Sequence, residues 1–223
     1  MNKSILRRIV QTISTLIFQC ILLFVSAWSL SWNWAWIFIA TGVIILVINY
    51  IVLPREVIEE RGRKKENVKK WDKILMTMNI IPVLGIYVLS GLDYRFNWSN
   101  NLHYSIHIIG LIVLFLGAML FTWSMVSNKF FSTMVRIQDE RGHQVAIEGP
   151  YKYVRHPGYV DFILMALATT IALGSIVALS MSCLVSVIFI ICTTLEDKIL
   201  HIELKGYEEY SKKVKYRLIP LIW

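Results

Sequence analysis

The sequence predicts an all-α membrane protein, a bundle of about six spanning helices followed by a C-terminal amphipathic helix. Hydrophobic residues make up 56% of its 223 residues and charged residues only 17%, whereas soluble domains are roughly half apolar and a quarter charged. Six apolar runs approach the length of about 20 residues that a membrane-spanning helix needs. All but one of the 23 Lys and Arg residues fall on the same side of these runs, as in multipass membrane proteins.

The six apolar runs are expected to be the spanning helices, at 9–30, 34–53, 74–92, 104–126, 158–173 and 176–195. The fifth run is short, and only Gly174 and Ser175 separate it from the sixth, so the two are predicted to form a tight hairpin. Pro82 lies inside the third run and should kink it. The first run is too long for the apolar part of a signal peptide, and no small-residue cleavage site follows it. We therefore expect no cleavable signal.

The basic residues predict the orientation of the chain. They gather at the N-terminus, in residues 54–73, in residues 128–157 and after the sixth run, and only Arg95 falls on the opposite side. The positive-inside rule then places both termini in the cytoplasm, in agreement with an even number of spans. The formal net charge of +8 is thereby explained by orientation and by contact with anionic membrane lipids, and we expect no nucleic-acid partner.

Two polar segments outside the spans have expected structures. The segment Pro54–Lys73 mixes charges of both signs, so we expect a solvated or interfacial helix without chemistry. After the sixth run, Leu200 and Leu204 recur at helical spacing. This pattern predicts an amphipathic helix to about residue 205, a turn at Gly206 and a second short helix, all at the cytoplasmic membrane face.

The sequence gives no indication of a metal site. Cys20, Cys183 and Cys192 lie inside apolar runs and lack the spacing of metal ligands. His103 and His107 are four residues apart and could share a metal ion, but no third ligand is near. We interpret them as interfacial histidines at the start of a span.

The stretch "GPYKYVRHPGYVD", residues 149–161, contains the first group of residues with possible chemistry. Pro157 suits the first turn of a helix, so Arg155 and His156 should lie at a helix N-terminus, which attracts anions. The hairpin returns the sixth run to the same membrane depth, where it ends in Glu196 and Asp197. Two interpretations remain open: a structural ion pair of Arg155 with Glu196 beside a capping His156, or a site for a zwitterionic ligand.

An amino-acid head group is a ligand of this kind. Its carboxylate would meet His156 or Arg155, and its ammonium would meet Glu196. Tyr151, Tyr153 and Tyr159 could offer ring faces to a further cation. S-adenosylmethionine combines an amino-acid head group with a sulfonium centre and a flat adenine, so it is the candidate cofactor.

The segments "RGHQVAIEGPYKYVRHPGY" and "LEDKILHIELKGYEEYSKKVKYRLIPLIW" resemble the isoprenylcysteine carboxyl methyltransferase family in its broad sense, which includes phospholipid N-methyltransferases. The resemblance covers about residues 128–223. It implies a single integral-membrane methyltransferase domain over residues 1–223, with S-adenosylmethionine entering from the cytosol and a lipophilic acceptor from the bilayer. By the family pattern, the catalytic residues would be Arg155, near the acceptor, and Glu196, and the cofactor pocket would be lined by His143, Gln144, Val145, Gly149, Tyr151, His156, Tyr159 and Glu196.

Three positions depart from this family pattern. Asp197 replaces the second residue of a Glu-Glu pair. We expect it to be solvated or paired with Lys198 or His201, while Glu196 points to the pocket. Cys192 stands where many members have an Arg, which weakens the case for an anionic acceptor. Asp161 stands where many relatives have Gly, and it could contact the acceptor or pair with Arg155.

The chemistry of the acceptor still favours a carboxylate or an already weakly basic acceptor. A carboxylate needs no base, whereas an amine must lose its proton first, and His156 would be occupied by the cofactor. Two other classes were weighed. A membrane reductase of the sterol-reductase type would bind NADPH and call for more clustered Arg and Lys. A transporter or other non-catalytic membrane protein would show more polar residues at mid-membrane.

Overall fold

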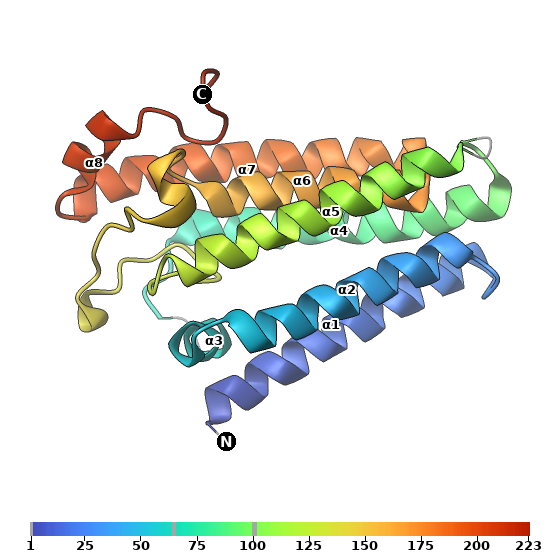
Figure 1. Cartoon of the computed structure of the whole chain (residues 1–223), viewed down its shortest axis with the longest axis horizontal. Coiled ribbons are helices and arrows are strands. Elements are labelled where there is room, and N and C mark those ends of the chain that lie inside the picture. Colours follow the sequence, from blue (N-terminus) through green and yellow to red (C-terminus); the bar gives the residue numbers. More distant parts are fainter. Residues whose placement is uncertain (1, 64–65, 100–101) are drawn as a thin grey trace.

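The computed structural model describes residues 2–63, 66–99 and 102–223 (Figure 1). Its described residues are helical with no strand, which confirms the predicted all-α bundle. The α-helices are α1 (Lys3–Ala27), α2 (Asn33–Val52), α3 (Arg55–Gly62), α4 (Lys70–Phe96), α5 (Tyr104–Val126), α6 (Pro157–Leu173), α7 (Ile176–Glu203) and α8 (Tyr207–Lys213). Two short 3-10 turns, Asp139–Arg141 and Gly149–Lys152, lie between α5 and α6.

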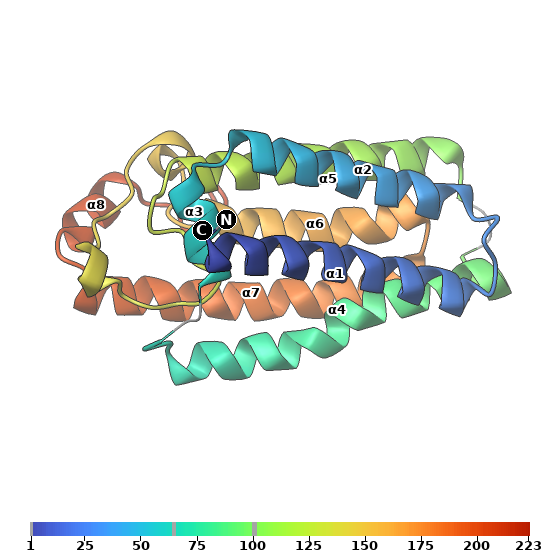
Figure 2. The same cartoon turned by 90° about the horizontal axis from the view of Figure 1, so that it is seen from below.

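Five helices of the described chain are long and apolar enough to cross a membrane: α1, α2, α4, α5 and α7. The sixth predicted span, α6, has 17 residues, or about 26 Å at 1.5 Å per residue, slightly less than the roughly 30 Å of a bilayer core. Pro82 lies inside α4, and Figure 2 shows this helix bent along its length. These features agree with a polytopic helical membrane protein.

The helices form a bundle in which α1 and α2 lie together on one side. Packing is most extensive between α5 and α6, between α4 and α7, and between α1 and α4. Figure 1 shows α1 and α2 together along one side of the bundle, with α3 at their end. Gly110 of α5 lies against the backbone at Ala172 of α6, where a Cβ atom would collide. Small residues at such crossings let membrane helices approach closely.

The predicted α6–α7 hairpin is confirmed. Gly174 ends α6 with a φ of 76°, a conformation that glycine adopts without strain. The Ser175 side chain then caps α7 by accepting from the Ala178 N–H at 3.1 Å. Its hydroxyl donates to buried Asp93 of α4 at 2.6 Å, which ties this turn to the rest of the bundle.

The expectation for Pro54–Lys73 was wrong. Among the described residues of this segment, only α3 is helical before α4 begins at Lys70. Val57, Ile58 and Glu60 of α3 are buried. The reason is a close contact with α1: Gly62 lies directly against the backbone of Ser4, where any side chain would collide. This part of the chain therefore belongs to the folded body of the protein.

The C-terminal segment follows the predicted helix, turn and helix, with Gly206 at a φ of 85°. It then folds back over the motif that precedes α6. The Arg155 and His156 N–H groups donate to the carbonyls of Tyr216 and Arg217 at 2.9 and 3.0 Å. This backbone pairing places the tail beside the candidate site.

Candidate functional site

One large cavity, of about 490 Å³, lies at the end of the bundle that carries α3 and α8. Along α7 its wall extends from Glu196 to Val185, which is about 16 Å of helix at 1.5 Å per residue. The Glu196 end is polar and aromatic. The other end is lined mainly by apolar side chains of α4, α6 and α7, with three polar side chains, Asn79, Tyr87 and Thr169, among them. The apolar residues are Met76, Val83, Ile86, Phe162, Met165, Ala166, Val185 and Phe189. The cavity can thus hold a ligand with a polar head and an apolar chain.

Most of the site residues predicted from sequence line this cavity. They are His143, Gln144, Val145, Tyr151, Arg155, His156, Tyr159 and Glu196. The structure does not bring Gly149 to the cavity wall. Gly149 has a φ of 58°, and a Cβ atom there would collide with the hydroxyl of Ser127. This glycine lets the chain turn closely against the end of α5, so its effect on the site is through the path of the backbone.

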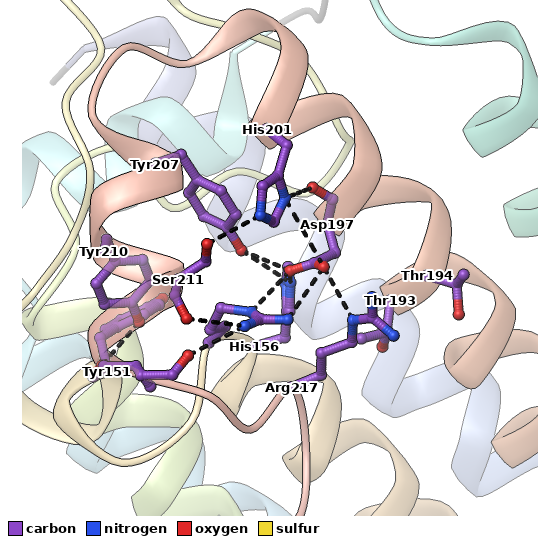
Figure 3. A network of polar contacts seen from close by, with 12 residues as sticks. Tyr151, His156, Thr193, Thr194, Asp197, His201, Tyr207, Tyr210, Ser211 and Arg217 are labelled. Carbon is purple, nitrogen blue, oxygen red and sulfur yellow. Dashed lines mark hydrogen bonds and ion pairs between the residues drawn. The ribbon is translucent and has the colours of Figure 1, made fainter. Parts of the chain in front are cut away.

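Asp197 is the centre of a buried polar network (Figure 3). Its side chain is 2% exposed. Oδ1 accepts from Arg155 Nε at 2.8 Å and from the Tyr207 hydroxyl at 2.9 Å. Oδ2 accepts from Arg155 Nη2 at 3.1 Å and from Arg217 Nε at 2.9 Å. His156 Nε2 lies 3.2 Å from Oδ1.

Asp197 is therefore not solvated. Of the two pairings expected for it, the one with His201 is present as a long contact, with Nδ1 3.9 Å from Oδ2. Tyr207 and Arg217 belong to the tail that folds back over α7, and they enclose the carboxylate together with Arg155. The neighbouring His201 contacts mainly the backbone of Asp197, with Nδ1 2.7 Å from the carbonyl oxygen. Sequence reasoning missed Tyr207 and Arg217, because no pattern in the tail predicts how it returns to the motif.

Arg155 pairs with Asp197 instead of Glu196. Besides its two bonds to Asp197, its Nη1 donates to the carbonyls of Val214 and Lys215 at 3.0 and 3.2 Å. Every nitrogen of this guanidinium is thus bonded within the protein. The side chain lines the cavity, and it ties the motif to the C-terminal tail.

Asp161 takes neither of the positions considered for it. It does not bond to Arg155, and it is not part of the cavity wall. Its side chain is 0% exposed and faces α5, where Gly117 leaves room for Oδ1. Neither carboxyl oxygen has a hydrogen-bond partner among the described residues.

Glu196 and His156 face the polar end of the cavity from two sides. Glu196 is half-buried, and no cation of the described chain forms an ion pair with it, while the Tyr159 side chain interacts with its carboxyl group. His156 is the N-cap residue of α6, but its side chain makes no capping bond. Its Nε2 is instead 3.2 Å from the Tyr207 hydroxyl and from Asp197. The carboxyl group of Glu196, which has no cationic partner among the described residues, suits a cationic ligand.

The loop between α5 and α6 forms the remaining wall, and long-range bonds hold it in place. The Val135 N–H donates to Asp72 Oδ2 of α4 at 2.9 Å, and Arg136 pairs with Glu60 of α3 at 3.0 Å. Gln138 donates to the Phe130 carbonyl at 2.5 Å. None of these anchoring contacts was predicted from the sequence.

His143 lies at the end of this loop as a neutral side chain. Its Nδ1 accepts from the Gln138 N–H at 3.3 Å, which leaves the proton on Nε2. Burial lowers the pKa of His143 to about 4, with smaller effects from nearby charges. At neutral pH this ring therefore offers one N–H donor and no charge.

Comparison with known proteins agrees with the resemblance noted in the sequence. Residues 108–202 match the model of the isoprenylcysteine carboxyl methyltransferase (ICMT) family. A protein-S-isoprenylcysteine O-methyltransferase of Schizosaccharomyces pombe is 38% identical over 110 residues, 48% of this chain and 46% of that protein. Protein-S-isoprenylcysteine O-methyltransferase B of Arabidopsis thaliana is 29% identical over 72 residues, 32% of this chain and 36% of that protein.

A probable protein-S-isoprenylcysteine O-methyltransferase of Oryza sativa subsp. japonica is 30% identical over 66 residues, 29% of this chain and 35% of that protein. The matches thus cover less than half the length of each of these relatives. The family-model match over residues 108–202 includes the loop between α5 and α6, α6 and most of α7, which line the cavity. The predicted family resemblance is confirmed for this part.

Proposed function

We propose that this protein is an integral-membrane, S-adenosylmethionine-dependent methyltransferase, because residues 108–202 match the model of the isoprenylcysteine carboxyl methyltransferase family. Its proposed acceptor is the carboxylate of an isoprenylated cysteine. One observation carries the proposal: a single cavity joins the motif residues to an apolar extension between α4, α6 and α7. The polar end suits the cofactor and the carboxylate, and the apolar end suits an isoprenyl chain.

The residues at the polar end fit S-adenosylmethionine. Glu196 has a charge without a cationic partner, and it would hold the ammonium group. The rings of Tyr151, Tyr159, Tyr207 and Tyr210 line the same end and favour a nearby positive charge. The Nε2 proton of His143 is a donor for the polar parts of the cofactor. When bound, the cofactor supplies an electrophilic methyl group on its sulfonium.

Arg155 acts in this proposal as a positioning residue. Its donors hold Asp197 and the carbonyls of the tail, so it fixes Tyr207 and His156 around the cofactor end. Methyl transfer requires the cofactor and the acceptor to be aligned. A rigid site favours this step, because correct placement of two reactants can lower the reaction barrier by several kcal/mol.

The acceptor is proposed to be a carboxylate because Glu196 is assigned to the cofactor ammonium and both described histidines of the site are already in contact with protein groups. A carboxylate attacks without losing a proton, whereas an ammonium group must first be deprotonated. Neutral His143 already uses its acceptor nitrogen for the Gln138 N–H. His156 is also occupied, because its Nε2 lies 3.2 Å from Asp197 Oδ1 and 3.2 Å from the Tyr207 hydroxyl.

The test uses the full chain purified in detergent. Calorimetry should show binding of S-adenosylmethionine, and the labelled donor should transfer its methyl group to N-acetyl-S-farnesylcysteine as a base-labile ester. Binding of NADPH without binding of S-adenosylmethionine would instead support a membrane reductase. Label that enters phosphatidylethanolamine and spares the farnesylated cysteine would refute the proposed acceptor.

A further inference from the structure

A second, smaller cavity lies outside the candidate active site, between the N-terminal part of α1, the C-terminal part of α2, α3 and the end of α5. Its volume is about 80 Å³. The polar part of its wall consists of Arg8, Thr12, Asn49, Tyr50 and Arg61. The rest of the wall is leucine, isoleucine, phenylalanine and methionine. Two arginines thus face one small, partly apolar space.

Neither of these arginines has a partner for its charge. Among the described residues, no carboxylate or carbonyl accepts a hydrogen bond from the guanidinium of Arg8 or Arg61, although both side chains are half-buried. Other partly or fully buried arginines of the chain have such partners: Arg136 bonds to Glu60, and Arg155 and Arg217 bond to Asp197. The small cavity therefore concentrates positive charge that the protein itself does not neutralise.

The position of Arg61 increases this imbalance. Its guanidinium lies 5.2 Å from the ring centre of Phe121 and 5.6 Å from that of Phe131. Burial, and to a smaller extent the charge of Arg8, lowers the pKa of Arg61 to about 9. Aromatic faces attract a cation only modestly, so they do not replace a counter-ion. A bound anion would stabilise both arginines.

The polar wall of the small cavity is held in place before any ligand binds. The contact of Gly62 with the backbone of Ser4 fixes α3 against α1. The hydroxyls of Thr12 and Tyr50 lie 3.1 Å apart and join α1 to α2. Asn49 of α2 accepts from Thr122 of α5 at 2.9 Å. A preformed site of this kind loses little side-chain freedom on binding.

We propose that this cavity binds a phosphate group, carried by the headgroup of an anionic phospholipid. Paired guanidinium groups match the charge and the several oxygens of phosphate. Basic pockets between membrane helices at the cytoplasmic side bind lipid headgroups, and the cavity lies at the end of the bundle that carries nearly all the basic residues. Its apolar wall suits the start of the acyl chains.

The experiment measures lipid binding to the delipidated full chain by native mass spectrometry in an uncharged detergent. Phosphatidylglycerol is compared with diacylglycerol of the same chains, which lacks phosphate. We expect Arg8→Gln and Arg61→Gln each to weaken phosphatidylglycerol binding about ten- to a hundredfold, since each removes charge-assisted hydrogen bonds. Arg7→Gln is the matched control, because Arg7 is exposed and adjacent to Arg8. It should bind like the unmodified protein.

Two further measurements distinguish a lipid phosphate from a soluble phosphate and control for misfolding. If inorganic phosphate or glycerol 3-phosphate displaces phosphatidylglycerol at similar concentration, the site takes a soluble phosphate. Arg61→Lys retains the charge and should bind with intermediate affinity. Equal binding of phosphatidylglycerol and diacylglycerol to the unmodified protein would overturn the proposal. So would equal binding of phosphatidylglycerol to the unmodified protein and to the folded Arg8 and Arg61 variants.

Discussion

Glu196 and Asp197 are adjacent acids with different surroundings in the structure. Consecutive residues of a helix point about 100° apart. Glu196 faces the cavity without a cationic partner, whereas Asp197 is enclosed by Arg155, Tyr207 and Arg217. The charge of Glu196 is thus available to a ligand, and the charge of Asp197 holds the protein together.

The substitution Asp197→Asn should therefore lower stability. It leaves two arginines beside a neutral side chain, and removing one partner of a buried ion pair lowers the free energy of unfolding by about 3–5 kcal/mol. Thermal unfolding in detergent would measure this loss. An unchanged melting temperature would contradict the central position assigned to Asp197.

Glu196→Gln is the matched substitution and should leave the melting temperature unchanged. Gln retains the size of the side chain but not its charge, so we expect S-adenosylmethionine to bind about tenfold more weakly or worse. Calorimetry on the two variants separates the effects. A melting temperature that falls as far as in Asp197→Asn would show that Glu196 is a structural residue.

His143 gives the stability of the protein a dependence on pH. Its pKa is lowered to about 4 by burial, against about 6.5 in an unfolded chain. Between these values the unfolded state binds the proton and the folded state does not, so the free energy of unfolding falls as pH decreases from 6.5 to 4. Above pH 6.5 this contribution is constant.

Replacing His143 by Gln should remove this contribution. Melting temperatures of the two proteins between pH 4 and 7.5 would show it, because the loss on acidification should be smaller in His143→Gln. Parallel curves would mean that His143 takes up its proton equally in both states. Gln retains a hydrogen-bond donor, so the comparison at pH 7.5 controls for loss of packing.

At the scale of elements, the helix α3 and the loop between α5 and α6 depend on each other. Glu60 and Arg136 are 76 positions apart in sequence, and their side chains are 1% and 6% exposed. This pair connects α3 to the wall of the cavity that contains Val135 and His143. A substitution in α3 should therefore also change cofactor binding at the polar end of the cavity.

Glu60→Gln should lower the free energy of unfolding by about 1–3 kcal/mol, because a buried charge-assisted bond is lost, and it should also weaken cofactor binding. Glu59→Gln is the control on the same helix. Its partner Arg63 is 47% exposed, and exposed pairs contribute about 0–1 kcal/mol. Thermal unfolding and calorimetry on both variants measure the difference. Equal effects would mean that the buried pair does not hold the loop.

The elements differ in how far the sequence predicts them. Apolar length alone predicts the long helices, since a bilayer demands it, and the two residues between the fifth and sixth runs predict the hairpin. The burial of α3 could not be predicted in the same way, because its mixed charges resemble those of a solvated helix. Its partners, Ser4 and Arg136, lie far away in the sequence, and only the assembled bundle brings them together.

The candidate site shows the same division. Motif positions such as His156, Tyr159 and Glu196 could be predicted, because the hairpin brings both its ends to one depth and the family pattern marks them. The enclosure of Asp197 by Tyr207 and Arg217 could not, since it depends on how an irregular tail folds back. Gly149 was predicted to line the pocket, but its backbone angle and the nearby Ser127 give it a different position.

The topology of the whole molecule depends on whether α6 crosses the membrane. Six crossings place both termini on one side, and five place them on opposite sides. Both termini lie toward the end of the bundle that carries α3 and α8 (Figures 1 and 2), and nearly all Lys and Arg residues would be cytoplasmic in this arrangement. We therefore expect reporter fusions at Asn2 and at Trp223 both to report the cytoplasm, and a fusion beside Arg95, between α4 and α5, to report the outside. A C-terminal fusion that reports the outside would mean that α6 enters and leaves the membrane on one side.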